Sequence, residues 1–174
     1  MLYVGVLAFL GLIVGLLVAK LAKDEIYSGK KYLVFFYKLV VFILLLLSLY
    51  FAWFAQIPHL ILGFLAGVLF HFGVRNIYFY LGGLFILSFF GLSENYFYLV
   101  SVFIFILGIL RGGLLKARFS NGSNITKRVF LSLIWFGIPF FMIFFRAEVL
   151  VVDSLVYSFI SGAIFMEFIK KIRL

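Results

Sequence analysis

"LILGFLAGVLFHFG", residues 60–73, has a near-copy 95 positions later in "LVYSFISGAIFMEF", residues 155–168. Four residues are identical at this offset: Leu60, Phe64, Gly67 and Phe70 match Leu155, Phe159, Gly162 and Phe165. Most other positions exchange one apolar residue for another. Long apolar stretches of this kind are typical of helices in a membrane or a buried core. The near-copy therefore predicts two related apolar helices in one chain.

Within each stretch, two small residues lie four positions apart. Gly63 and Gly67 form this pair in the first stretch, and Ser158 and Gly162 repeat it in the second. Residues four apart lie on one face of a helix, where small side chains let a second helix backbone approach closely. We therefore expect all four residues to be helix-packing positions.

The whole chain has the composition of an integral membrane protein. Of its 174 residues, 67% are hydrophobic and 12% are charged, whereas soluble domains are about 45–50% apolar and about 25% charged. The charged residues gather between recurring apolar runs, as expected of helices that cross a hydrocarbon layer about 30 Å thick. The sequence predicts an all-α polytopic membrane protein with a single transmembrane domain over residues 1–174. We expect it in the plasma (inner) membrane of a prokaryote.

Seven apolar segments predict about seven transmembrane helices. They cover residues 2–19, 32–55, 59–74, 77–92, 96–115, 129–145 and 149–169. The segments at 59–74 and 77–92 are shorter than the roughly 20 residues of an untilted span. Alternatively, these two segments form a re-entrant pair, and all remaining connections would then stay on the same side of the membrane.

The charged connections predict the orientation. Twelve basic residues fall in alternate connections and in the C-terminal tail: Lys20, Lys23, Lys30, Lys31, Arg75, Lys116, Arg118, Lys127, Arg128, Lys170, Lys171 and Arg173. The other connections hold one basic residue, Arg146. Because basic connections stay in the cytoplasm, we expect the N-terminus outside and the C-terminus inside. The net charge of +9 then indicates contact with anionic lipid headgroups at the cytoplasmic face, and no nucleic-acid partner.

The matching stretches lie four crossings apart and therefore point the same way through the membrane. This predicts two parallel three-helix units, residues 1–74 and 96–174, joined by a linker helix at 77–92. Alternatively, the similarity of the two stretches reflects only the apolar composition of the chain, and no repeat follows from it. This 3-1-3 order, with the N-terminus outside, resembles the organisation of the SWEET and PQ-loop transporters, and the resemblance implies a substrate site between the units. The chain lacks their Pro-Gln dipeptide, and its two prolines are Pro58 and Pro139, so no binding residue is carried over.

Ionisable residues inside apolar segments are the candidates for a binding site, because a charge at a helix centre costs about 2.5–3.5 kcal/mol on insertion scales. Five such residues fall in the cytoplasmic third of the predicted bundle: Lys38, His71, Arg75, Arg111 and Glu167. Together they would line an inward-facing vestibule that attracts an anionic substrate or a lipid headgroup. Alternatively, Lys38 and Arg111 extend to the membrane surface, and Glu167 pairs with Lys170 on its own helix.

Three further residues mark the predicted outer end: His59, Glu94 and Asp153. They would form an outer rim that attracts cations, together with the nearby Arg146 and Glu148. Alternatively, each is a solvated residue at a helix end. For Asp153 this second interpretation has a physical basis, because the dipole at a helix start stabilises a carboxylate.

Enzyme chemistry finds little support in the sequence. The chain has no cysteine, which excludes disulfides and thiolate catalysis. Its two histidines, His59 and His71, fall near opposite ends of one predicted helix and cannot bind the same metal ion in a monomer. The sequence also lacks the Gly-X-Ser-X-Gly motif of serine hydrolases. We therefore expect no catalytic residue, no metal and no cofactor.

"WFGIPFF" at residues 135–141 predicts a local kink in the sixth segment. Proline removes a backbone donor from the helix ladder, and a nearby glycine weakens the helix further. The freed carbonyl groups would be available to a neighbouring helix, water or a ligand.

Three functions are compatible with these features. The first is a small transporter or channel for a small solute or ion, which binds between the two three-helix units. The second is a non-catalytic assembly subunit of a larger membrane complex, and the chain could also form a homo-oligomer. The third is a lipid-handling enzyme or translocator. A polar cavity between the units would favour the first, a solid bundle the second, and a carboxylate or hydroxyl next to Lys38 or Arg111 the third.

Overall fold

The computed structural model describes residues 2–22, 25, 28–53, 57–91, 94–118, 122–140 and 153–170. Within these ranges every long element is an α-helix and no strand occurs. The helices are α1 (Leu2–Leu21), α3 (Lys30–Ala52), α4 (Ile57–Gly73), α5 (Ile77–Gly91), α6 (Glu94–Arg118), α7 (Gly122–Gly137) and α9 (Asp153–Ile169). The predicted all-α class is therefore confirmed.

Three helices are long and apolar enough to cross a membrane. They are α1, over Tyr3–Leu21, α3 and α6. Helices α4, α5 and α9 are apolar but shorter, with 17, 15 and 17 residues. Large apolar side chains such as Leu17, Leu62 and Phe130 are exposed on the outside of the bundle, a surface that suits lipid better than water. Association with a membrane is thus supported, while spanning by the shorter helices stays a prediction.

The sixth predicted segment differs most from its observed helix. Helix α7 begins before residue 129 and ends at Gly137, and a short 3₁₀ turn follows at 138–140. Pro139 cannot donate to the carbonyl four residues earlier, so the α-helical ladder stops next to it. Among the described residues, the predicted kink is therefore a helix end, and the remainder of this segment, 141–145, lies outside them.

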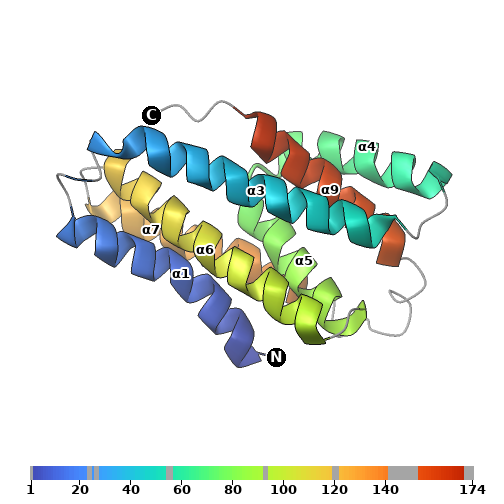
Figure 1. Ribbon diagram of the computed structural model, residues 1–174, viewed down its shortest axis with the longest axis horizontal. Coiled ribbons are helices and arrows are strands. Elements are labelled where there is room, and N and C mark those ends of the chain that lie inside the picture. Colours follow the sequence, from blue (N-terminus) through green and yellow to red (C-terminus); the bar gives the residue numbers. More distant parts are fainter. Residues whose placement is uncertain are drawn as a thin grey trace.

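Figure 1 shows how the helices lie in space. Helix α1 packs beside α6, and α4 packs beside α9. Helix α3 contacts both α6 and α9, while α5 contacts α6, α7 and α9. Helices α1, α4, α6 and α9 run in one direction, and α3, α5 and α7 run in the other. As a result, the helix ends that carry the described basic residues of the connections face one end of the bundle.

The contact between α1 and α6 is made by glycines on both helices. A Cβ atom on Gly11 or Gly15 would overlap a carbonyl oxygen of α6. In the other direction, a Cβ on Gly112 would lie 2.5 Å from the carbonyl oxygen of Leu12, and one on Gly108 would lie 2.7 Å from the Leu12 nitrogen. The two backbones therefore touch directly, which no larger residue would allow.

The contact between α4 and α9 is built in the same way, and it brings the two similar stretches face to face. A Cβ on Gly63 would lie 2.7 Å from the carbonyl oxygen of Leu155, and a Cβ on Gly67 would overlap α9 backbone. Gly162 of α9 lies equally close to α4. Ser158 donates its hydroxyl hydrogen bond to the carbonyl of Leu60. The small-residue pairs of the two stretches thus pack against each other.

Candidate functional site

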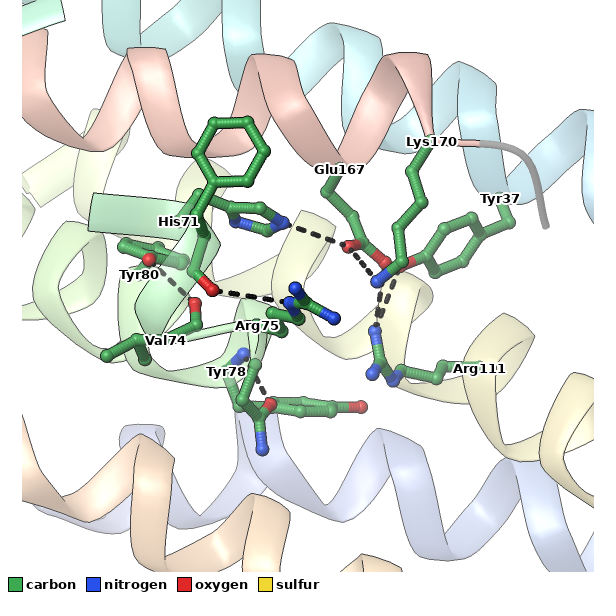
Figure 2. A network of polar contacts seen from close by, with 11 residues as sticks. Tyr37, His71, Val74, Arg75, Tyr78, Tyr80, Arg111, Glu167 and Lys170 are labelled. Atoms are coloured by element: carbon green, nitrogen blue, oxygen red, sulfur yellow. Dashed lines mark hydrogen bonds and ion pairs between the residues drawn. The ribbon is translucent and has the colours of Figure 1, made fainter. Parts of the chain in front are cut away.

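A buried carboxylate lies where four helices meet. Glu167, in the last turn of α9, is only 6% exposed. Its polar neighbours are Tyr37 of α3, His71 of α4, Arg111 of α6 and Lys170, which follows α9. Figure 2 shows their side chains pointing toward one another. We call these five residues the Glu167 cluster.

One carboxylate oxygen of Glu167 is shared by two donors. The Tyr37 hydroxyl donates to Oε1 over 2.9 Å. Nη1 of Arg111 lies 3.4 Å from the same oxygen and donates to the Tyr37 hydroxyl oxygen over 3.0 Å. The carboxylate, phenol and guanidinium therefore form a closed triangle that joins α3, α6 and α9.

The second carboxylate oxygen faces two further groups. Nζ of Lys170 lies 3.1 Å from Oε2, and Nε2 of His71 lies 3.9 Å from it. The Lys170 side chain is 47% exposed, whereas that of His71 is buried. Lys170 thus closes the cluster toward the outside, and His71 closes it toward α4.

The position of Glu167 explains why it needs these partners. A helix C-terminus carries a partial negative charge, so a carboxylate in the last turn is unfavourable by itself. A buried charge must also be compensated by a partner and by hydrogen bonds. Arg111, Lys170 and the Tyr37 hydroxyl supply this compensation from both sides.

The turn between α4 and α5 brings a second layer of residues under the cluster. The side-chain oxygen of Asn76 accepts a hydrogen bond from the Tyr78 backbone N–H over 3.1 Å and so caps the start of α5. Nε of Arg75 donates to the carbonyl of Phe72 over 3.3 Å. Figure 2 shows the guanidinium of Arg75 and the side chain of Tyr78 on the side of the turn that faces Arg111.

Two buried polar atoms next to the cluster have no hydrogen-bond partner among the described residues. They are the Tyr78 hydroxyl and Nδ1 of His71. Tyr78 is fully buried, and the Arg111 guanidinium lies 5.3 Å from the centre of its ring. Buried polar groups are almost always paired, so each unpaired atom marks a place where a water molecule or a ligand group has a reason to bind.

The structure brings together three of the five predicted binding residues, His71, Arg111 and Glu167, and Arg75 lies beside them. Lys38 makes no described hydrogen bond or ion pair with them, and its ammonium lies 5.8 Å from the centre of the Phe168 ring.

Tyr37 and Tyr78 were not predicted. The sequence has 10 tyrosines and 26 phenylalanines, and their spacing does not separate a hydrogen-bonding tyrosine from one that faces lipid. The ion pair of Glu167 with Lys170 was the alternative interpretation of Glu167, and the structure contains it together with the Arg111 contact.

The three predicted rim residues lie at helix starts. His59 is exposed in the first turn of α4, and Glu94 is exposed as the first residue of α6. Asp153 is the first residue of α9, and its side chain is outside the described residues, as are Arg146 and Glu148. No group of three histidine or acidic side chains within the described ranges is arranged to hold a metal ion.

An apolar cavity of about 290 Å³ lies beside the cluster, between α4, α5, α9 and the end of α7. Its walls include Phe70, Phe79, Tyr80, Pro139 and Phe159. The ring of Tyr80 also stacks on His71, with ring centroids 5.7 Å apart, and its hydroxyl donates to the carbonyl of Val74 over 2.8 Å. One aromatic side chain therefore separates the apolar cavity from the buried charges.

A comparison of the chain with protein-family models, curated proteins and solved structures gave no match.

Proposed function

We propose that this protein is a small seven-span membrane transporter or channel, in which a small solute or ion passes between two three-helix units. The observation that carries the proposal is the burial of Glu167 among side chains from α3, α4 and α6. Ionisable groups are costly inside a membrane, and those that occur there usually serve a transport path or a binding site. The cluster joins helices of the first unit to helices of the second.

The direction of the helices supports the proposed topology. Successive helices alternate in direction (Figure 1), so the described basic residues of the connections gather at one end of the bundle. By the positive-inside rule that end faces the cytoplasm. Helices α1, α3 and α6 have the length of full spans. The shorter apolar helices α4, α5 and α9 would cross by local thinning of the bilayer.

The pairing of the helices supports two parallel repeats. The first unit contains α1, α3 and α4, and the second contains α6, α7 and α9 in the corresponding order. Helix α1 packs against its counterpart α6, and α4 packs against its counterpart α9. Exchanging the two units maps the contact of α3 with α6 onto the contact of α7 with α1, and both contacts occur. It also maps the contact of α3 with α9 onto one of α7 with α4, and these two helices do not pack together within the described residues, so the correspondence is partial. A unit of three helices starts and ends on opposite sides of the membrane, so a second unit can have the same orientation only if one more helix lies between them. Helix α5 would be this linker.

In this proposal, the Glu167 cluster is the cytoplasmic closure between the units. Its triangle of Tyr37, Arg111 and Glu167 ties α3, α6 and α9 together. A solute that competes for one of these groups loosens the closure and lets the units part. Binding energy at the cluster is thereby converted into a shift between closed and open states.

Transport is tested with the purified chain in liposomes. Concentration jumps of sodium, potassium, chloride, inorganic phosphate and acetate are applied to proteoliposomes on a solid-supported membrane, and osmotic swelling is followed with glycerol and a monosaccharide. We expect a current or a swelling rate above that of empty liposomes for at least one solute. If every solute gives the rate of empty liposomes, the proposal is wrong.

The apolar cavity favours lipid handling as a second candidate function, and it is not the polar cavity between the units that we expected of a transporter. The cavity is large enough for part of an acyl chain, and only the Tyr80 side chain lies between it and His71 of the charged cluster. Arg111 also meets a carboxylate and a hydroxyl, as expected for this function. Lipid movement is tested in proteoliposomes that contain a fluorescent phospholipid, because dithionite quenches only the label in the outer leaflet. Loss of protection of the inner-leaflet label would support lipid movement, and full protection would oppose it.

A further inference from the structure

We propose that the Glu167 cluster, together with Arg75 and Tyr78, binds an oxyanion, namely the phosphate or carboxylate group of the transported solute or of a lipid headgroup. This inference rests on the proposed function, because it names the class of solute that the same site accepts. Four independent features of the site point to it: the balance of charge, the free donor capacity of Arg111, the unpaired Tyr78 hydroxyl and the start of α5.

The balance of charge at the site is positive. Arg111 and Lys170 both lie within 3.4 Å of the single carboxylate of Glu167, and Arg75 lies next to them (Figure 2). Arg111 and Lys170 therefore share one buried carboxylate, and the exposed Arg75 adds a further positive charge nearby. Uncompensated charge is costly in a medium of low dielectric constant. An added anion would restore neutrality, whereas an added cation would increase the imbalance.

Arg111 has donors to spare for an anion. Its described hydrogen bonds to Tyr37 and Glu167 both leave from Nη1. A guanidinium has five N–H donors in a planar fork that matches a carboxylate or a phosphate. The remaining edge of the fork can therefore bind an oxyanion while Nη1 keeps its present contacts.

The Tyr78 hydroxyl supplies a second, independent sign of a ligand. Tyr78 is fully buried, and its hydroxyl has no hydrogen-bond partner among the described residues. Figure 2 shows this hydroxyl directed toward the guanidinium of Arg111. An oxyanion held by Arg111 would accept the missing hydrogen bond of Tyr78, and such bonds to a charged acceptor are the stronger kind.

The start of α5 adds to the attraction. Helix α5 has 15 residues and begins directly after Arg75 and Asn76, on the side of the turn that faces the cluster. The N-terminus of a helix carries a partial positive charge and favours a nearby anion. The helix dipole, Arg75 and Arg111 thus act in the same direction.

Glu167 is then the internal competitor of the ligand. Its carboxylate holds Nη1 of Arg111 and Nζ of Lys170 when no oxyanion is bound. An incoming oxyanion shares or replaces these contacts, which weakens the triangle that joins the units. Neutralising Glu167 should therefore strengthen anion binding.

The test measures binding to the full chain by titration calorimetry. In one arm inorganic phosphate is titrated into the detergent-purified protein, and in the other arm soluble phosphatidic acid is titrated into protein in phosphatidylcholine nanodiscs. We expect binding in at least one arm, and about tenfold weaker binding in Arg111→Lys, which keeps the charge but loses the fork. Tyr78→Phe should bind several-fold more weakly without disturbing the packing, and Glu167→Gln should bind more tightly.

Lys38→Gln is the matched control, because Lys38 neighbours Tyr37 but lies over the ring of Phe168, and we expect its affinity to equal that of the parent chain. Binding of phosphate alone identifies a free anion, and binding of phosphatidic acid alone identifies a headgroup. The inference is wrong if neither ligand binds, or if Arg111→Lys and Tyr78→Phe bind as tightly as Lys38→Gln. Anion binding without any flux would refute transport alone, and flux of cations without anion binding would refute this inference alone.

Discussion

At the scale of single residues, Glu167 is the centre of the proposed site. It is a carboxylate in the last turn of a helix, and it is buried among an arginine, a tyrosine and a histidine from three other helices and a lysine that follows its own helix. Neither the helix dipole nor the membrane favours a charge at this position. The buried carboxylate is tolerated only because its partners compensate its charge, so replacing a partner should lower the stability of the folded chain.

Removing the arginine should therefore destabilise the folded chain. Arg111→Leu leaves Glu167 buried with only part of its compensation, and we expect a loss of about 3 kcal/mol in the free energy of unfolding. Adding Glu167→Gln removes the uncompensated charge and should restore most of that loss. Thermal or denaturant unfolding in detergent measures both variants. A double variant no more stable than Arg111→Leu would show that the ion pair is not the cause.

The sequence identifies the ionisable members of the site but not their contacts. His71, Arg111 and Glu167 stand out because each interrupts an apolar segment. Lys38 stands out for the same reason, yet its ammonium lies over the ring of Phe168 and makes no described polar contact with the cluster. Successive residues of a helix point about 100° apart, so Lys38 cannot share the direction of its neighbour Tyr37, and only the packing of the helices decides which of the two faces the core.

At the scale of the helices, small residues determine which helices touch. The apolar runs predict most helices within a few residues, because hydrophobicity and length alone define such segments. The partner of each helix depends on where backbones can approach. The glycine seam between α1 and α6, built from Gly11, Gly15, Gly108 and Gly112, has the same four-residue spacing as the pairs in α4 and α9, and this spacing was the available signal.

Two adjacent glycines of α6 provide a test of this packing. A Cβ on Gly112 would lie 2.5 Å from a backbone oxygen of α1, whereas a Cβ on Gly113 would lie 3.6 Å from the flexible end of Leu33. We expect Gly112→Ala to lower the free energy of unfolding by about 1–3 kcal/mol through overpacking, and Gly113→Ala to leave it nearly unchanged. Unfolding of the two variants under one set of conditions compares them directly. Equal stabilities would contradict the direct contact of the backbones.

At the scale of the whole molecule, the alternating helices and the basic connections predict one orientation in the membrane. The all-α class follows from the composition, because helices satisfy their own backbone hydrogen bonds within lipid. The number of crossings does not follow, since α4, α5 and α9 are shorter than a full span. Their depth depends on the local thickness of the bilayer and on tilt, which the sequence does not encode residue by residue.

Single cysteines test this topology without interference, because the chain has none of its own. Lys31→Cys and Glu94→Cys place exposed labels at the starts of α3 and α6, and Arg75→Cys labels the turn between α4 and α5. An impermeant maleimide should label Glu94→Cys from the outside only, and the other two from the cytoplasm only. Labelling of Lys31→Cys and Glu94→Cys from the same side would contradict the predicted topology. An unlabelled Arg75→Cys would favour a re-entrant pair.

In the proposed mechanism, transport between the two units depends on the Glu167 cluster. The most direct test of this dependence compares Glu167→Gln with Lys38→Gln in proteoliposomes, using the solute that gives the largest flux with the parent chain. Both changes remove one charge from the same depth of the bundle, but only Glu167 belongs to the cluster. We predict that Glu167→Gln loses at least nine-tenths of the flux, corresponding to about 1.4 kcal/mol or more, and that Lys38→Gln keeps it. Equal fluxes in the two variants would contradict the account.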